Sequence, residues 1–209
     1  KTPLTPLRNK WDGALTKPLM DPEWQKVRAR PHRTPRRARL NLIQFYVLHR
    51  AYLTPRKINI YFPGTNASCP RCQMLDADLQ HMLWNCPSLR DYWVAITTQL
   101  TTLTGCSELH NCGAITLGIF KQPKRNKITI KFVNLGLILA LRLITGAWKS
   151  KNPPRHKQWA ADLVNWATAE YSLLSADEAK GLRKYPIAAG WEALTLQFQL
   201  QNKDDSLPP

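Results

Sequence analysis

Apolar side chains recur along much of this chain with the spacing of a helix, three or four residues apart. Such stripes cover three segments: Leu40, Ile43, Val47 and Ala51; Leu89, Tyr92, Trp93, Ile96, Leu100 and Leu103; and Trp159, Leu163 and Trp166. A stripe with this period marks the buried face of an amphipathic helix. Almost no segment alternates polar and apolar residues as a half-buried strand does. The pattern predicts a mostly α fold with a helical, bundle-like body.

Capping residues predict where these helices begin and end. Cap-and-proline signals open short helices at Asp21-Pro22 and Thr54-Pro55, and Gly105 ends the helix that starts near residue 88. Pro31 and Pro35 break the basic run at 26–39 into a loop. Thr34-Pro35 is then the predicted start of a further helix. A capping box at 175–178 and an apolar stripe from Trp191 predict two more helices near the end of the chain.

The longest apolar run, residues 132–148, predicts a core helix over about 128–149. It is interrupted by Asn134 and Arg142, so it is a poor membrane span, and no membrane partner is expected. We expect an organisation into five parts: an extended, proline-containing lead-in (1–20), basic N-terminal helices (21–64), a metal-binding knuckle with the following helix (65–104), a C-terminal helical region (105–201) and a disordered tail (202–209).

Three cysteines and one histidine gather within eighteen residues in the pattern C-x2-C-x8-H-x4-C. They are Cys69, Cys72, His81 and Cys86. Thiolates with one imidazole suit tetrahedral Zn²⁺, and four protein ligands leave no open position for water. Asp76 or Asp78 is placed to cap a short helix that presents His81. The pattern predicts one structural zinc in a small CCHC knuckle; four unrelated residues, or a disulfide and a spare thiol, are the alternatives.

Two further cysteines with a histidine, Cys106, His110 and Cys112, form an incomplete second half-site, and buried or free thiols are the default interpretation. An odd total of 5 cysteines favours a reducing, intracellular compartment, nuclear and cytoplasmic.

Charge points to a polyanionic partner. The chain carries 30 Lys and Arg against 14 Asp and Glu, and residues 1–60 hold 14 of the cations but 3 of the acids, a net +11. Arginine forks suit phosphates, so RNA or DNA is the expected partner and no small-molecule substrate is expected. Solvated surface is the alternative. The candidate contacts are Arg28, Arg30, Arg33, Arg36, Arg37, Arg39, Arg50, Arg56 and Lys57.

Aromatic residues beside the metal pattern, with His81 and Met82, offer a second candidate contact, a surface on which unstacked bases lie. Trp84 is as well suited to packing over the metal site, and His49 either contacts phosphate or is held by core hydrogen bonds. Acidic residues are scattered singly, and the sole Asp-Asp pair, Asp204-Asp205, lies in the polar tail. No two-metal catalytic site is therefore predicted, and the fragment is expected not to be an enzyme.

Four stretches in order carry a resemblance: KWDGAL…DPEWQKV, RLNLIQFYVLHRAYLTPRKINIYFP, CPRC…LQHMLWNCPSLRDYWVAI and LRLITGAWKSKNPPRHKQWAADLVNWATAEYSLL. They resemble the region C-terminal to the polymerase in LINE-type non-LTR retrotransposon proteins, which includes the reverse-transcriptase zinc-binding domain. The resemblance spans roughly residues 10–175 and matches the four ligand residues to the family's zinc positions. The helix before Trp148 departs from it, because it carries only Arg142 as a cation.

The resemblance implies a non-catalytic segment of a protein that copies RNA into chromosomal DNA by target-primed reverse transcription. The parent protein would be an RNA-directed DNA polymerase with an endonuclease. Two functions follow for this segment: zinc-stabilised nucleic-acid binding, or an architectural role in which it docks the polymerase domain of the same polyprotein or a host factor.

Overall fold

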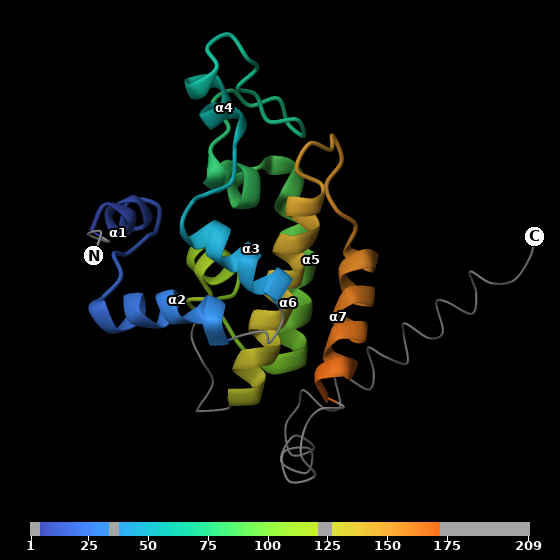
Figure 1. Ribbon diagram of the computed structural model, residues 1–209. Helices are drawn as coiled ribbons and strands as arrows, with labels where there is room; N and C mark the ends of the chain where they lie inside the picture. Colours follow the sequence, from blue (N-terminus) through green and yellow to red (C-terminus); the bar gives the residue numbers. More distant parts are fainter. Residues whose placement is uncertain (1–4, 34–37, 121–126, 172–209) are drawn as a thin grey trace, which may run out of the picture.

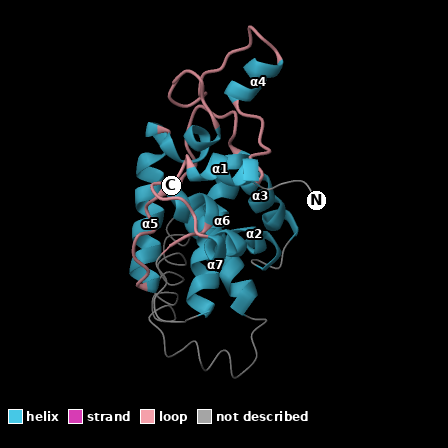
Figure 2. Cartoon of the chain, turned by 90° about the vertical axis from the view of Figure 1, so that its left-hand side faces the viewer, coloured by secondary structure: helices cyan, strands magenta, loops and turns pink. Residues whose placement is uncertain are grey.

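The computed structural model describes residues 5–33, 38–120 and 127–171, and within them every regular element is helical (Figures 1 and 2). The prediction of a mostly α fold is confirmed. The α-helices are α1 (Thr5–Asp12), α2 (Asp21–Arg33), α3 (Ala38–Leu48), α4 (Pro55–Tyr61), α5 (Arg90–Thr104), α6 (Lys127–Gly146) and α7 (His156–Tyr171). Three short helical turns accompany them: η1 (His81–Asn85), η2 (Pro87–Leu89) and η3 (Gly113–Leu117).

Helix α6 is the centre of the body and packs against α3, α5, α7 and η3 (Figure 1). An 18-residue window of it, Thr129–Gly146, is long and apolar enough to cross a membrane. However, 72% of that window is buried inside the protein, so the surrounding helices already shield its apolar surface. The window therefore serves here as a core helix, as the interrupted apolar run predicted.

Tryptophan side chains tie distant segments to this body. Trp11, Trp93 and Trp159 are almost fully buried, and each donates its indole N–H to a backbone carbonyl: those of Leu48 (2.8 Å), Leu83 (2.9 Å) and Gly136 (2.8 Å). A buried indole needs such a partner, because an unpaired donor in the core is costly. Each tryptophan thus combines a large apolar contact with one fixed orientation.

The N-terminal part differs from expectation in two places. The lead-in is not extended throughout, because Thr5–Asp12 forms α1, where Pro6 falls in the first turn and needs no N–H partner. Trp11 anchors this helix to α3. The break expected at Pro31 is also wrong, since α2 continues to Arg33 with Trp24 and Val27 buried against the body. Packing of this apolar face outweighs the one hydrogen bond that Pro31 removes.

Several predicted helix ends are confirmed. The hydroxyl of Thr54 accepts the Lys57 N–H at 3.2 Å and caps α4, and Gly105 closes α5 in the left-handed region at φ 67°. The start predicted at Thr34-Pro35, the helices predicted at 175–178 and from Trp191, and the tail at 202–209 lie outside the described residues.

Candidate metal centre and nucleic-acid interface

The segment that follows α4 lies with it at one end of the molecule (Figure 1), and Cys69 and Cys72 share one tight turn of this segment. The Gln73 N–H donates to the Cys69 carbonyl at 2.9 Å, and the Cys69 N–H donates to the Met74 carbonyl at 2.8 Å. These bonds close the chain on itself around Pro70-Arg71, so both thiols face the same side. Gln73 lies at φ 62°, the left-handed conformation that such a closure requires. We call residues 62–89 the knuckle.

His81 and Cys86 are positioned by η1, a single π-type turn. Asp78 Oδ1 accepts the His81 N–H at 2.8 Å, which confirms the predicted cap, and the Cys86 N–H donates to the His81 carbonyl at 3.1 Å. An i→i+5 bond of this kind places residues five apart on the same side of a widened turn. The x4 spacing between His81 and Cys86 fits this geometry, and Pro87 then opens η2.

The four ligand atoms meet in one place, all within 4.8 Å of one another. Cys69 Sγ lies 3.8 Å from Cys86 Sγ, and Cys72 Sγ lies 3.2 Å from His81 Nε2. Bonds of about 2.3 Å from a tetrahedral ion to sulfur imply an S···S edge of about 3.8 Å. All five cysteines are free thiols, and a disulfide would need about 2.05 Å. The cluster can hold a metal ion, because its four residues are brought together and its sulfurs stand too far apart for a disulfide.

The surroundings of the cluster favour the ligand forms of His81 and Cys86 but not that of Cys72. Burial lowers the pKa of His81, as does the neighbouring Arg71, so its imidazole stays neutral and keeps a lone pair. Burial raises the pKa of Cys72 to about 11, a cost that a bound cation would offset. Burial acts the same way on Cys86, but hydrogen bonds from Arg71 and the Ser88 backbone outweigh it and lower the pKa.

Arg71 lies inside the knuckle, between the two cysteines of the first turn in sequence and beside Cys86 in space. It is 9% exposed and donates to the carbonyl of Met82, while Nε and Nη1 have no hydrogen-bond partner. Three thiolates and a divalent cation together carry one negative charge. A buried guanidinium next to them supplies the balancing positive charge.

The second cysteine group does not assemble into a site among the described residues. Cys106 is fully buried, His110 Nδ1 pairs with Thr97 Oγ1 at 3.1 Å, and Cys112 Sγ contacts Gln80 Nε2 at 3.6 Å. The default interpretation of free thiols holds for Cys106 and Cys112.

The predicted base-stacking surface beside the metal pattern is also absent. His81 and Met82 are buried, and the Trp84 ring packs against His110 and Trp93 with centroids 4.9 and 6.4 Å away. Trp84 therefore packs inside the protein, but these contacts are with α5 and His110 and do not test the predicted packing over the metal site.

The structure separates the predicted arginine contacts into three groups. Arg28, Arg39 and Arg56 are exposed. The side chains of Arg33, Arg36 and Arg37 lie outside the described residues. Arg30, Arg50 and Lys57 are held by the protein.

Arg50 stacks over Trp11 at 5.0 Å and lies 3.9 Å from Asp78, and Lys57 donates to the Arg50 carbonyl. Burial lowers the pKa of Lys57, and repulsion from Arg50 and Lys10 lowers it further, so positive charge is concentrated here. Arg30 is directed inward from α2, where its Nη1 approaches the Thr116 carbonyl at 3.4 Å. These three cations make their contacts within the protein, so their main contribution is to the stability of the fold and not to an exposed binding surface.

A row of aromatic rings runs from the solvent face of α3 to the end of α6. Phe45 stands 4.2 Å from His49 and 6.3 Å from Tyr46, Tyr46 stands 5.8 Å from Tyr52, and Tyr52 stacks on Trp148 at 5.2 Å. Phe45 and Tyr46 are 42% and 39% exposed. We call these five residues the aromatic row. His49 is thus an exposed member of this row, and the hydrogen-bonded core position weighed for it is wrong.

Two exposed cations flank the aromatic row: Arg39 lies on the same face of α3, and Lys149 follows Trp148. Trp148 is held in place by its indole N–H, which donates to the Leu53 carbonyl at 2.9 Å. Sequence reasoning singled out the segments around His49 and Trp148 through the family resemblance, but it did not place them in contact.

A scan against protein-family models gives no match, and a search of curated proteins gives no significant match. The geometry of the residues is therefore the basis for assigning a function.

Proposed function

We propose that this chain is a zinc-stabilised, non-catalytic nucleic-acid-binding segment of a non-LTR retrotransposon reverse transcriptase protein. Its role is to engage RNA or target DNA during target-primed reverse transcription, inside the nucleus and cytoplasm. The observation that carries the nucleic-acid part is the exposed aromatic row with cations at its side. The retrotransposon part follows from the resemblance of the quoted stretches.

One structural zinc is the metal we assign to the Cys69, Cys72, His81 and Cys86 cluster. Three soft sulfurs and one nitrogen suit this ion, and the protein supplies all four ligands. Bound there, the ion would supply a cross-link between the two halves of the knuckle and no reaction chemistry.

Single-stranded nucleic acid suits the aromatic row better than a duplex does. Every base offers a π-face to a ring, and stacking contributes about 1–3 kcal/mol per base. Arg39 and Lys149 are placed to contact phosphates of a strand whose bases lie on the rings. The remaining positive charge, part of a net +16, draws the polyanion toward the molecule.

The test is a fluorescence anisotropy titration of the full chain with a labelled single-stranded RNA at several salt concentrations. Tyr46→Ala is expected to weaken binding about tenfold, because one stacking contact is lost. Tyr61→Ala removes an equally large but more exposed ring from α4, outside the row, and is expected to leave the affinity unchanged.

Charge is tested in the same titration. Arg39→Ala should reduce the slope of log affinity against log salt by somewhat less than one unit, since one phosphate contact of a single strand is lost. Equal effects of Tyr46→Ala and Tyr61→Ala, together with an unchanged slope for Arg39→Ala, would refute the assigned interface.

An architectural docking role is the second candidate, and a separate observation favours it. Large apolar side chains face solvent in two places. One is the end of α4 and the residue after it (Ile60, Tyr61 and Phe62), and the other is a turn of the knuckle (Met74 and Leu75). Exposed apolar groups of this kind mark protein contacts. Docking would be favoured over nucleic-acid binding if the chain binds no RNA or DNA at low salt but does bind the polymerase domain. In that case Leu75→Ser should weaken binding to the polymerase domain.

A further inference from the structure

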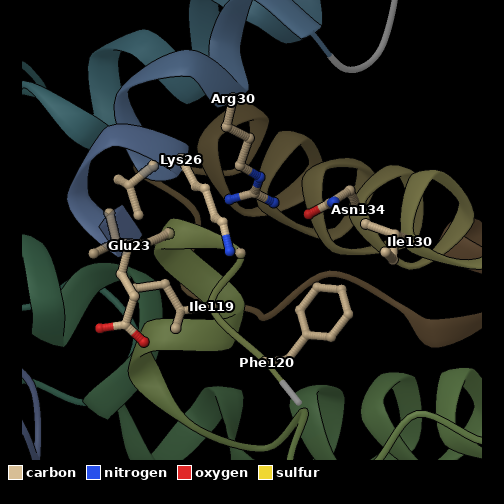
Figure 3. Close-up of a pocket in the computed structure, with 10 residues that line it drawn as sticks. Glu23, Lys26, Arg30, Ile119, Phe120, Ile130 and Asn134 are labelled. Carbon is tan, nitrogen blue, oxygen red and sulfur yellow. The ribbon is translucent and has the colours of Figure 1, made fainter. Parts of the chain in front are cut away.

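A pocket of about 280 Å³ opens between α2, the end of η3 and the start of α6 (Figure 3). Its polar lining comes from Glu23, Lys26 and Arg30 on α2 and Asn134 on α6. Its apolar lining includes Ile119, Phe120 and Ile130. This volume lies just below the range typical of small-molecule sites, so the pocket suits a small ligand.

Arg30 is the unusual member of this lining. Its Nε and Nη2 are shielded from solvent and have no hydrogen-bond partner, and its Nη1 makes a long bond to the Thr116 carbonyl at 3.4 Å. No carboxylate among the described residues lies within ion-pair distance of it. Burial lowers the pKa of this guanidinium to about 10. This half-buried cation, with two shielded and unpaired donor nitrogens, lacks among the described residues the anion that would normally compensate it.

The backbone is shaped to admit this side chain. Gly118 follows η3 at φ 71°, and a Cβ atom at this position would stand 2.5 Å from Arg30 Cζ and Nε. Glycine is therefore required twice, for its left-handed conformation and for the guanidinium that passes directly over it. The inward position of Arg30 is a built feature of α2 and η3.

The rest of the pocket complements a ligand with an anionic end and a flat apolar end. Lys26, one turn before Arg30 on α2, points its amine into the same space, and the Phe120 ring faces that space from the opposite wall (Figure 3). Glu23 accepts the Met20 N–H at 3.0 Å, and its carboxylate points away from Arg30. Asn134 Oδ1 is buried without a partner and offers an acceptor.

We propose that this pocket binds a nucleotide, with its phosphate on Arg30 and Lys26 and its base against Phe120. Two cations match the charge of a terminal phosphate better than that of a single carboxylate, and a guanidinium is suited to donate to phosphate oxygens. The apolar wall of Phe120, Ile119 and Ile130 accommodates the base. This site is separate from the aromatic row and does not depend on the proposed function.

The experiment is isothermal titration of the full chain with adenosine monophosphate, inorganic phosphate, adenosine and acetate, in phosphate-free buffer. The monophosphate is expected to bind more tightly than inorganic phosphate, and adenosine and acetate more weakly still. Lys26→Gln should weaken the monophosphate about threefold, as for one partly exposed charge, and Arg30→Gln at least tenfold. Arg28→Gln removes one exposed charge from the same helix outside the pocket and should change nothing.

A variant outside the buried centre keeps the test decisive if Arg30→Gln does not fold. Phe120→Ala should weaken the monophosphate but not inorganic phosphate, because only the base contact is lost. The proposal is overturned if the monophosphate does not bind, if Arg28→Gln weakens it as much as Lys26→Gln does, or if inorganic phosphate binds as tightly. Tyr46→Ala should leave this binding intact, which separates it from the aromatic row.

Discussion

Two arginines of this protein, Arg30 and Arg71, lie inside the fold, and each leaves two guanidinium nitrogens without a partner. Burial of an unpaired charge is costly, so each position needs a compensating anion. For Arg71 that anion is the negatively charged thiolate cluster beside it. For Arg30 the pocket provides room for one. In our two proposals, the same residue type supports a metal centre in one place and a nucleotide site in another.

Replacing Arg71 tests its role beside the metal cluster. Arg71→Met keeps much of the side-chain volume but removes the charge and the hydrogen bond to Met82, so metal affinity should fall about tenfold. The measurement is competition for Zn²⁺ against a chromophoric chelator. Arg90→Met, at an exposed position on α5, is the matched control. Equal affinities for both variants would mean that Arg71 acts only in packing.

His156 makes the body sensitive to acid. Burial lowers its pKa in the folded chain, and its Nε2 is shielded without a partner at the start of α7. As pH falls below about 6.5, the unfolded chain takes up this proton first, so folding stability drops; above that pH the residue contributes no difference. Urea unfolding at pH 7.5 and 5.5 should show a smaller loss for His156→Gln than for the unmodified chain. His49→Gln, at an exposed position, should not reduce the loss.

At the scale of elements, the contact of α5 with α6 depends on one glycine. A Cβ at Gly136 would stand 2.7 Å from Leu100 Cδ2, so the two helices approach closely there. Gly136→Ala is expected to destabilise the chain by about 1–2 kcal/mol, because overpacking outweighs the gain in helix propensity. Urea denaturation measures this.

Gly146→Ala, at the open end of the same helix, is the control for that measurement, since nothing lies within 4 Å of its added Cβ. A loss of stability as large as that of Gly136→Ala would show that backbone conformation, not crowding by Leu100, is responsible.

Periodicity and caps predicted most helices of this fold but missed those decided by packing. Most residues of the stripes at 40–51, 89–103 and 159–166 lie on the buried faces of α3, α5 and α7. Ala51 is an exception, because α3 ends at Leu48 and Ala51 is exposed. By contrast, α1 and the extension of α2 through Pro31 contradict local signals, because Trp11 in α1 and Trp24 and Val27 in α2 are buried against the rest of the body. Tertiary contacts outweighed proline at these two places.

At the scale of the whole molecule, the first part of the knuckle and the helical body are stabilised in different ways. Met82, Leu83 and Leu89 of the knuckle join the apolar core around α6. Residues 62–76 contribute Cys69 to that core and are held mainly by backbone bonds and the ligand cluster. Chelation should therefore speed amide hydrogen exchange in residues 65–90 first and leave α6 protected. Elemental analysis should find one zinc per chain before chelation and none in Cys72→Ser. Unchanged exchange throughout the chain after metal removal would contradict this division.

The sequence by itself determined the four residues that can hold a metal ion, the helical class and the excess of positive charge, because these depend on residue type and on spacings of a few residues. Only the tertiary structure decided which cations remain exposed and which groups assemble. Arg30 meets Thr116 across 86 residues, and Trp148 meets Leu53 across 95. Such contacts follow from how helices pack around α6, a property that no local pattern encodes.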